Sequence, residues 1–227
     1  MARRIAEEAI AMCPEVAMAY QLMAGVHWND ISLGSTKSPG ESIEKGIEML
    51  QKALALDDTY ADAHALLGYL YVCKREYDKS ITEGERAVAL SPNGAYVIVR
   101  YSTILNLVGR AEEAIPLLQK AIRLDPYGPG YYYLYLGNSL FNTGRFEEAV
   151  SAYKKALQRA PNHMSAHLYL AATYSKMGRK KEARAEAAEV LRINPKFSVD
   201  YWAKIIPYKD QSDKDKVINA LRKAGLK

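Results

Sequence analysis

Apolar positions recur along this chain with helical spacing, and the stretch GPGYYYLYLGNSLFNTGRFEEAV (128–150) shows the pattern most clearly. Tyrosine propensity alone would favour a β-strand there. At 100° per residue, however, the positions separate into two faces. The packing face holds Tyr133, Leu136, Gly137 and Leu140. The opposite face holds Tyr131, Tyr135, Asn138 and Asn142, within about 60° of one another. The pattern therefore predicts a helix with one packing face and one polar–aromatic face, and it leaves Tyr132 between them.

A two-helix phrase returns along the chain with a period near 34 residues. Similar phrases (ERAVALSPN, QKAIRLDPY, KKALQRAPN, AEVLRINPK) end at prolines spaced by 34, 35 and 34 residues, namely Pro92, Pro126, Pro161 and Pro195. Seventeen residues before the last three prolines stand Gly109, Gly144 and Gly178. Glycine can take the left-handed conformation that ends a helix, and proline prevents a helix from continuing. Each block is therefore predicted to be a helix, a tight turn and a second helix.

Stacked copies of such a block predict an all-α solenoid of antiparallel helix pairs. Two short helices cannot bury their apolar faces alone, whereas neighbouring copies bury them against each other. Five repeats result, at 17–60, 61–94, 95–129, 130–163 and 164–197. We expect them to form a single domain over 1–227.

These blocks resemble the tetratricopeptide repeat (TPR), whose pattern is W-x2-L-G-x2-Y, then A-x3-F, then P. The fourth block matches it with Tyr133, Leu136, Gly137, Leu140, Ala149, Tyr153 and Pro161. The second and fifth place His64 and His167 at the first large position. Two blocks depart from the pattern, through Ser80, Gly84, Tyr101 and Ser102. The resemblance implies a right-handed superhelix whose first helices line a concave groove.

The N-terminal part deviates from the regular repeat in two places. Residues 2–13 match only a second helix, closed by Pro14, so 1–16 are expected to form a half-repeat. Either the chain is cut from a longer polypeptide, which we favour, or that helix is an N-terminal cap. The first repeat is ten residues longer than the others, and the surplus lies in WNDISLGSTKSPGES. Its Gly, Ser and Pro content predicts a loop between the two helices.

The C-terminal residues 198–227 are predicted to form capping helices. SVDYWAKII begins a sixth unit that Pro207 stops. The final helix has Ser212 and Asp213 as candidate N-caps and Gly225 as its end. Its apolar stripe consists of Val217, Leu221 and Ala224. Such a helix would shield the apolar edge of the last repeat.

A closer resemblance covers nearly the whole chain. SLGSTKSPGESIEKGIEM, ALALDDTYADAHALLGYLY and NPKFSVDYW are similar to the TPR region that lies C-terminal to the catalytic domain of bacterial class III adenylate/guanylate cyclases. This resemblance implies a regulatory or scaffolding module of a cytoplasmic signalling protein. It implies no cyclase activity, because no part of the chain resembles the catalytic domain.

Charge and composition narrow the range of partners. The net charge is +5, and from Lys176 to Lys227 there are 14 basic and 7 acidic residues. The signs are interspersed there, as in KKEARAEAAEV, so we interpret this end as a solvated helical surface and disfavour nucleic-acid binding. No apolar run is long enough for membrane insertion. Glu7 and Glu8 interrupt any signal peptide, and the isolated Cys13 and Cys73 fit a reducing compartment.

Catalytic, cofactor and metal signatures are missing from the sequence. No Gly-rich phosphate loop, HExxH, GxSxG or Cys/His cluster occurs, so we expect neither an enzyme nor a cofactor. His163 and His167 have i,i+4 spacing, but His167 holds a packing position and no third ligand is near in sequence. Cys73 is interpreted as a small buried or groove-lining side chain.

The remaining functional hypothesis concerns the inner face that the TPR resemblance implies. The predicted protein- or peptide-binding residues are Tyr69, Tyr96, Arg100, Thr103, Asn106, Tyr131, Tyr135, Asn138, Asn142 and Tyr169, with Val72 and Lys176 beside them. Asparagine offers a donor and an acceptor to a peptide backbone, and tyrosine offers area with few rotors. Alternatively, these residues are a solvated lining or are covered by the chain's own tail.

Two further partner hypotheses follow. Chaperone-binding TPR domains carry a Lys/Asn/Arg clamp for a C-terminal carboxylate. The clamp positions, read from the second repeat, hold Ala65, Tyr69, Arg100, Tyr131 and Tyr135, and read from the third they hold Val99, Thr103, Tyr135, Ser165 and Tyr169. A chaperone tail is therefore disfavoured. Self-association through the terminal repeats is the alternative function, because a lone second helix leaves an apolar edge uncovered.

Overall fold

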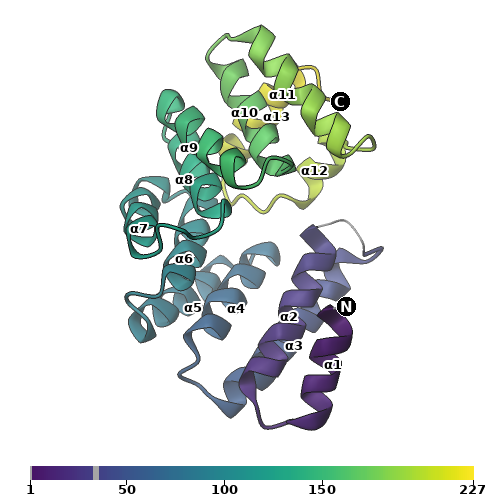
Figure 1. The fold of residues 1–227 in the computed structure, drawn as a ribbon, viewed down its shortest axis with the longest axis vertical. Helices are drawn as coiled ribbons and strands as arrows, with labels where there is room; N and C mark the ends of the chain where they lie inside the picture. The colour runs from purple at the N-terminus through teal and green to yellow at the C-terminus, as the bar shows by residue number, and fades with distance from the viewer. Residues whose placement is uncertain (1, 33–35) are drawn as a thin grey trace. The chain divides into compact units, whose positions relative to one another are not determined.

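The computed structural model describes residues 2–32 and 36–227, and every regular element in them is an α-helix (Figure 1). The thirteen helices of the described residues are α1 (Ala2–Met12), α2 (Ala17–Ser32), α3 (Pro39–Leu56), α4 (Ala61–Cys73), α5 (Tyr77–Leu90), α6 (Ala95–Leu107), α7 (Ala111–Leu124), α8 (Tyr131–Asn142), α9 (Phe146–Arg159), α10 (Met164–Lys176), α11 (Lys180–Ile193), α12 (Val199–Ile205) and α13 (Gln211–Lys223). The all-α prediction is confirmed, and each of the five predicted repeats contains two helices.

The chain divides into two compact units, unit 1 (Met1–Ile104) and unit 2 (Leu105–Lys227). In unit 1, α2 packs on α3 and α4 on α5, while α1 covers α2 and α3 contacts α4. In unit 2, α8 packs on α9 and α10 on α11, while α7 contacts α8 and α9 contacts α10. Helix pairs thus stack in sequence order within each unit, as repeats must in order to bury their apolar faces. The division falls inside α6, the first helix of the third predicted repeat.

The turn within each of the last four repeats contains one residue in the left-handed conformation. Gly109, Gly144 and Gly178 have φ angles of +88°, +81° and +75°, as predicted. In the second repeat the equivalent residue is Arg75, with φ +63°. It is the one non-glycine residue with positive φ among those described. The turn geometry is therefore kept even where the residue that favours it is missing.

The predicted long loop of the first repeat is wrong in extent, because its sequence is largely helical. α2 continues through Trp28 to Ser32, and α3 begins at Pro39, so that these helices have 16 and 18 residues. The corresponding helices of the second repeat have 13 and 14. Pro39 starts α3 rather than breaking it, since the first helical turn needs no N–H donor there and accepts the fixed φ of proline. Residues 33–35 of this insert lie outside the described residues.

In two of the repeats, a histidine connects the two helices of that repeat in the same way. His64 Nδ1 lies 2.5 Å from Glu83 Oε2, and its Nε2 lies 2.9 Å from the carbonyl oxygen of Asp58. In the fifth repeat His167 Nδ1 lies 2.6 Å from Glu186 Oε2 and Nε2 lies 3.0 Å from the Pro161 carbonyl oxygen. Each ring thus joins the first helix of its repeat to the second helix and to the preceding loop.

In the fourth repeat, a tyrosine and an arginine make this connection in place of a histidine. Tyr133 is half-buried rather than a fully buried core residue, because its ring lies 4.8 Å from the Arg159 guanidinium of α9. Arg159 in turn donates to the carbonyl oxygens of Gly128 and Pro126 in the preceding loop. The large position of each of these repeats therefore has the same connecting role with different chemistry.

The C-terminal helices fold back onto the last repeat, and α13 packs against α10 (Figure 1). The predicted stripe of α13 is confirmed, since Val217, Leu221 and Ala224 are at most 1% exposed. Gly225 has φ +101°, as expected for the residue that ends the helix. The predicted N-caps are wrong: Ser212 and Asp213 lie in the first turn, and Asp210 holds the N-cap position. Irregular backbone runs from Ile206 to Asp210, and α13 begins at Gln211, before the predicted start.

Candidate functional site

The predicted binding residues are divided between the two units. Unit 1 holds Tyr69, Tyr96, Arg100 and Thr103. Unit 2 holds Asn106, Tyr131, Tyr135, Asn138, Asn142 and Tyr169. They therefore form two sets, one in each unit.

In unit 1 the structure brings a cation and three aromatic rings together. The Arg100 guanidinium lies 5.2 Å from the centroids of both Tyr69 and Tyr96. Trp28 of α2 meets Tyr69 edge to face, with centroids 4.7 Å apart. Cation–π contacts of this kind contribute about 0.5–2 kcal/mol each and fix the orientation of the guanidinium. This cluster joins the first helices of three successive repeats.

Sequence reasoning missed Trp28, although a signal was present. Trp28 is the twelfth residue of α2, as Val72 is the twelfth of α4, and Val72 was predicted to lie beside the groove. The residue was instead assigned to the inserted loop, and the continuation of α2 is what places it against Tyr69.

Two predicted residues are used in packing. Thr103 is 4% exposed, and its hydroxyl donates to the Val99 carbonyl oxygen of its own helix at 2.8 Å. Asn138 is 8% exposed, and its Oδ1 accepts a hydrogen bond from the Tyr153 hydroxyl at 3.0 Å. Because both side chains are buried and bonded within the chain, they offer little to a partner.

The tyrosine run of α8 separates into faces. Tyr131 and Tyr135 are half-buried and pack edge to face, with ring centroids 5.9 Å apart. Tyr132, which the periodicity left unassigned, is 4% exposed and meets Tyr131 at 5.0 Å. Tyr133 lies against α9 instead. Tyr131 and Tyr135 therefore give unit 2 an aromatic pair with accessible surface.

The remaining predicted residues of unit 2 hold a segment of the chain itself. Asn142 Nδ2 donates to Asn106 Oδ1 at 2.9 Å and to the Tyr208 hydroxyl at 3.3 Å. The Tyr169 and Tyr208 hydroxyls lie 3.4 Å apart. The backbone N–H of Lys209 donates to the Leu107 carbonyl oxygen at 2.9 Å. Tyr208 is only 2% exposed, and burial raises the pKa of its phenol.

A hollow of about 220 Å³ lies at the end of α8 in unit 2. Two lysines from α10 and α13 contribute to it, and the rest of its wall is aromatic or polar. Its lining consists of Phe141, Asn142, Thr143, Gly144, Phe146, Lys176 and Lys216. It shares Asn142 with the surface that holds Tyr208.

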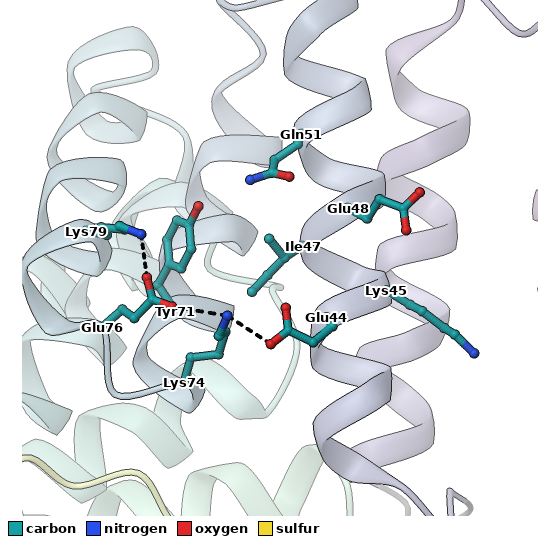
Figure 2. A pocket seen from close by; sticks show the side chains of 9 residues that line it. All are labelled: Glu44, Lys45, Ile47, Glu48, Gln51, Tyr71, Lys74, Glu76 and Lys79. Atoms are coloured by element: carbon teal, nitrogen blue, oxygen red, sulfur yellow. Dashed lines mark ion pairs between the residues drawn. The ribbon is translucent and has the colours of Figure 1, made fainter.

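A second hollow, of about 350 Å³, lies in unit 1 between α3 and the α4–α5 turn (Figure 2). Figure 2 shows Lys74 between Glu44 and Glu76, at 2.9 and 3.1 Å, and Lys79 paired with Glu76 at 2.6 Å. These charges compensate one another at the protein surface, where water screens each pair. The network connects neighbouring repeats and offers no distinct ligand chemistry.

The described residues show no metal-binding group, no reactive thiol at Cys73 and no membrane-spanning helix. They contain no group of three His, Cys, Asp or Glu side chains that could hold a metal ion. Both ring nitrogens of His167 face protein oxygen atoms. Burial raises the pKa of the Cys73 thiol to about 12, so it remains protonated and a poor nucleophile. None of the described helices has the length and hydropathy needed to span a bilayer.

Comparison with known families agrees with this geometry. Two family models, each described as tetratricopeptide repeat, match residues 95–127 and 140–205. The matched residues include α6, α7, the last three residues of α8 and α9 to α12. They contain Asn106, Asn142 and Tyr169 of the unit 2 set, whereas Tyr131, Tyr135 and Asn138 lie outside both matches.

Curated relatives share parts of the chain. It is 28% identical over 118 residues to the small glutamine-rich tetratricopeptide repeat-containing protein 2 of Mycosarcoma maydis, covering 52% of this chain and 33% of that protein. It is 24% identical over 207 residues to the Hsp70-Hsp90 organizing protein of Triticum aestivum, covering 75% and 36%. The chain thus spans about a third of the length of these relatives.

Solved structures show the same helical repeat fold. YrrB, described as a TPR protein with an unusual peptide-binding site, has a TM-score of 0.53 at 24% identity, covering 88% of this chain and 97% of that one. The type IV pilus biogenesis factor PilW has a TM-score of 0.64 at 20% identity, covering 88% and 89%. MamA AMB-1 has a TM-score of 0.55 at 26% identity, covering 70% and 93%.

Proposed function

We propose that this chain is a non-catalytic protein-interaction module that binds an extended peptide or a helix of a partner along the first helices of its repeats. The observation that carries the proposal lies in unit 2. There Asn106, Asn142 and Tyr169 hold an extended segment through amide and phenol groups. These are the residue types and contacts expected for peptide capture. Relatives that are named as organizing proteins support the same class of function.

The partner is proposed to differ from the chaperone tails suggested by the names of some relatives. A clamp for a C-terminal carboxylate needs lysine and asparagine side chains, and Ala65, Tyr69 and Tyr131 stand at such positions. In the structure, Arg100 is held between two tyrosine rings. An aromatic surface of this type favours a ligand with apolar or aromatic side chains.

The biological setting is proposed to be a cytoplasmic signalling protein. The support is the resemblance of nearly the whole sequence to the TPR region that follows the catalytic domain of bacterial class III cyclases, together with two cysteines that form no disulfide. In that setting the module would regulate or localise an output domain. A reading frame that encodes no signalling domain would contradict this part of the proposal.

Tyr131 and Tyr135 provide the test of partner binding. The full chain carrying Tyr131→Ala and Tyr135→Ala is compared with the native chain by affinity capture from cells that encode it, with quantitative mass spectrometry. Partners captured by the native chain are expected to fall by about tenfold or more, since aromatic residues dominate such interfaces. The matched control is Tyr127→Ala, which removes a tyrosine that is 96% exposed. Unchanged capture by the double variant, with unchanged circular dichroism, would place binding elsewhere.

Self-association is the second candidate, and one observation favours it. Large apolar side chains are exposed along α1 and the start of α2 in unit 1, namely Ile5 (45%), Met12 (81%), Val16 (44%), Met18 (64%) and Leu22 (39%). Such a concentration is typical of an interaction surface. Sedimentation of the native chain and of Met12→Lys/Met18→Lys tests it. A monomer at every concentration for both chains removes this candidate.

A further inference from the structure

We propose that the surface of unit 2 formed by Asn106, Asn142 and Tyr169, together with the adjoining hollow, is a binding site for an extended peptide that carries a tyrosine and a neighbouring acidic residue. Residues 206–210 are its built-in occupant. This inference rests on the proposed function, because it names one ligand and one site of the same interaction module. We refer to Ile206–Asp210 as the occupant segment.

The occupant segment has the geometry of a bound peptide rather than of a core element. It belongs to no helix and lies between α12 and α13. Ile206 and Tyr208 are 7% and 2% exposed, whereas Pro207 is half-buried and Lys209 is exposed. This alternation is how an extended peptide places every second side chain into its receptor. One backbone hydrogen bond, from Lys209 to Leu107, fixes its register.

The polar groups of the site are only partly used by this segment. The contacts of the Tyr208 hydroxyl with Asn142 Nδ2, at 3.3 Å, and with the Tyr169 hydroxyl, at 3.4 Å, are long. Typical distances are about 2.9–3.0 Å for N–H···O bonds and about 2.7–2.8 Å for O–H···O bonds. Asn142 Oδ1 is buried, and no described residue donates to it. A buried acceptor without a donor is unfavourable, so a ligand that supplies an N–H or O–H there would bind more tightly than the occupant.

The charge of the adjoining hollow indicates the second feature of the ligand. Lys176 and Lys216 line it, and none of the described residues in its lining is acidic. Lys216 contacts Asp213 at 2.6 Å, outside the lining. The occupant places Lys209, a cation, directly after Tyr208. A ligand with Asp or Glu in place of Lys209 would complement the lysines. The acidic residue of the occupant, Asp210, comes one position later and lies beside Gly109.

The competition is intramolecular, and it makes the site selective. A tethered segment is present at a high effective concentration, so a weak fit still fills the site. A partner is therefore bound only if it exceeds the occupant in affinity, and its apparent affinity is reduced by the fraction of chains that are occupied. α13 need not leave α10, because Val217 and Leu221 anchor it separately.

The experiment uses two fluorescein-labelled peptides, IIPYKDQ, which is the sequence of residues 205–211, and IIPYEDQ, in which glutamate replaces the lysine. Fluorescence anisotropy is measured with the full native chain and with full chains carrying Tyr208→Ala, Tyr208→Ala/Asn142→Ala or Tyr201→Ala. Tyr201 is a matched control, since it is 54% exposed on α12. Tyr208→Ala is expected to bind IIPYEDQ about tenfold more tightly than the native chain, because its site is vacated.

The other chains make the result specific. Adding Asn142→Ala should remove most of that gain, and Tyr201→Ala should behave as the native chain. IIPYEDQ should bind more tightly than IIPYKDQ, with a difference that shrinks as salt rises. Equal affinity of native and Tyr208→Ala chains for both peptides overturns the proposal. A preference for IIPYKDQ overturns the acidic part of it.

A milder variant distinguishes a structural role of Tyr208 from its role in filling the binding site. If Tyr208→Ala lowers the helical signal, the full chain with Tyr208→Phe is used, which removes the hydroxyl and keeps the ring. Faster hydrogen exchange at the Lys209 amide, with α8 and α10 unchanged, and tighter binding of IIPYEDQ support the proposal. Exchange that accelerates equally throughout unit 2, without peptide binding, overturns it. Neither of these measurements involves Tyr131 or Tyr135. A negative result here therefore leaves the affinity-capture test of the proposed function valid.

Discussion

The ring of Tyr101 packs onto Gly84, so that a Cβ atom built at Gly84 would lie 2.5 Å from Cδ2 of Tyr101. These residues are two of the four departures from the repeat pattern in unit 1. Gly84 stands where the fourth repeat has Tyr153, and Tyr101 stands where the second, fourth and fifth repeats have a leucine. The aromatic ring missing from one repeat is therefore supplied by the next. The two weak matches to the pattern therefore reflect one packing arrangement, in which the ring of Tyr101 occupies the space beside Gly84.

Gly84→Ala is accordingly expected to destabilise unit 1, although alanine favours helices more than glycine does. The added methyl overlaps the Tyr101 ring, and overpacking of this kind costs about 1–3 kcal/mol. Tyr101→Leu should restore stability in the Gly84→Ala background while lowering it in the native one. Urea unfolding of the four chains of this cycle measures the coupling. Additive effects would mean that the two sites are independent.

Arg75→Gly is expected to raise the free energy of unfolding by about 1 kcal/mol, because a left-handed residue with a Cβ atom is strained by about 1–2 kcal/mol. The side chain is exposed and occupies the place that glycine has in three other repeats. Urea or thermal unfolding measures the gain. Arg75→Ala is the control, since it keeps the Cβ atom and should give no gain. If both variants stabilise equally, the charge rather than the conformation is responsible.

The hydrogen bond to Glu186 raises the pKa of His167 above its ordinary value of 6.5. Both ring nitrogens face oxygen atoms, so the doubly protonated ring satisfies the site. Its stabilising contribution is therefore complete below about pH 6.5 and is lost as the pH rises through the raised native pKa. Titration of the His167 ring by NMR should show the raised pKa, and Glu186→Gln should lower it.

The pKa must be measured at His167 itself, because the pKa of the nearby His163 is shifted in the opposite direction. Burial lowers the pKa of His163, so its contribution is lost as the pH falls rather than as it rises. Glu112→Gln, an exposed change on α7, is the control and should leave the His167 titration unchanged. A His167 pKa that does not respond to Glu186→Gln would contradict the proposed hydrogen bond between His167 and Glu186.

Leu221→Ala is expected to lower the stability of unit 2 by about 2–5 kcal/mol, since it leaves a cavity where α13 meets the rest of the unit. Leu221 is fully buried. Leu191→Ala removes a leucine that is 41% exposed and should cost far less. Thermal unfolding compares the two. Similar small losses would show that α13 is attached only loosely.

Several features of this chain follow from short-range patterns. The spacing of Pro92, Pro126 and Pro161 predicted the repeats, and Gly109 and Gly225 predicted where helices end. These signals are readable because they depend on local hydrogen bonding and backbone sterics, which a few residues decide. The same reasoning failed for Ser212 as an N-cap and for Trp28, because a residue that suits a loop also suits a helix once its surroundings favour one.

The use of the polar residues on the inner face was decided only by the tertiary structure. Asn138 and Asn142 lie on the same face of α8 in the sequence pattern. Asn138 accepts from Tyr153, whereas Asn142 bonds to Tyr208, 66 residues further along the chain. No local pattern distinguishes the two, since each partner is brought close by the packing of other helices. The sequence by itself determined the helices, their repeat and the composition of the face. The long-range packing determined which side chains are buried, which hold the chain's own segment and which, as Tyr131 and Tyr135 do, keep accessible surface.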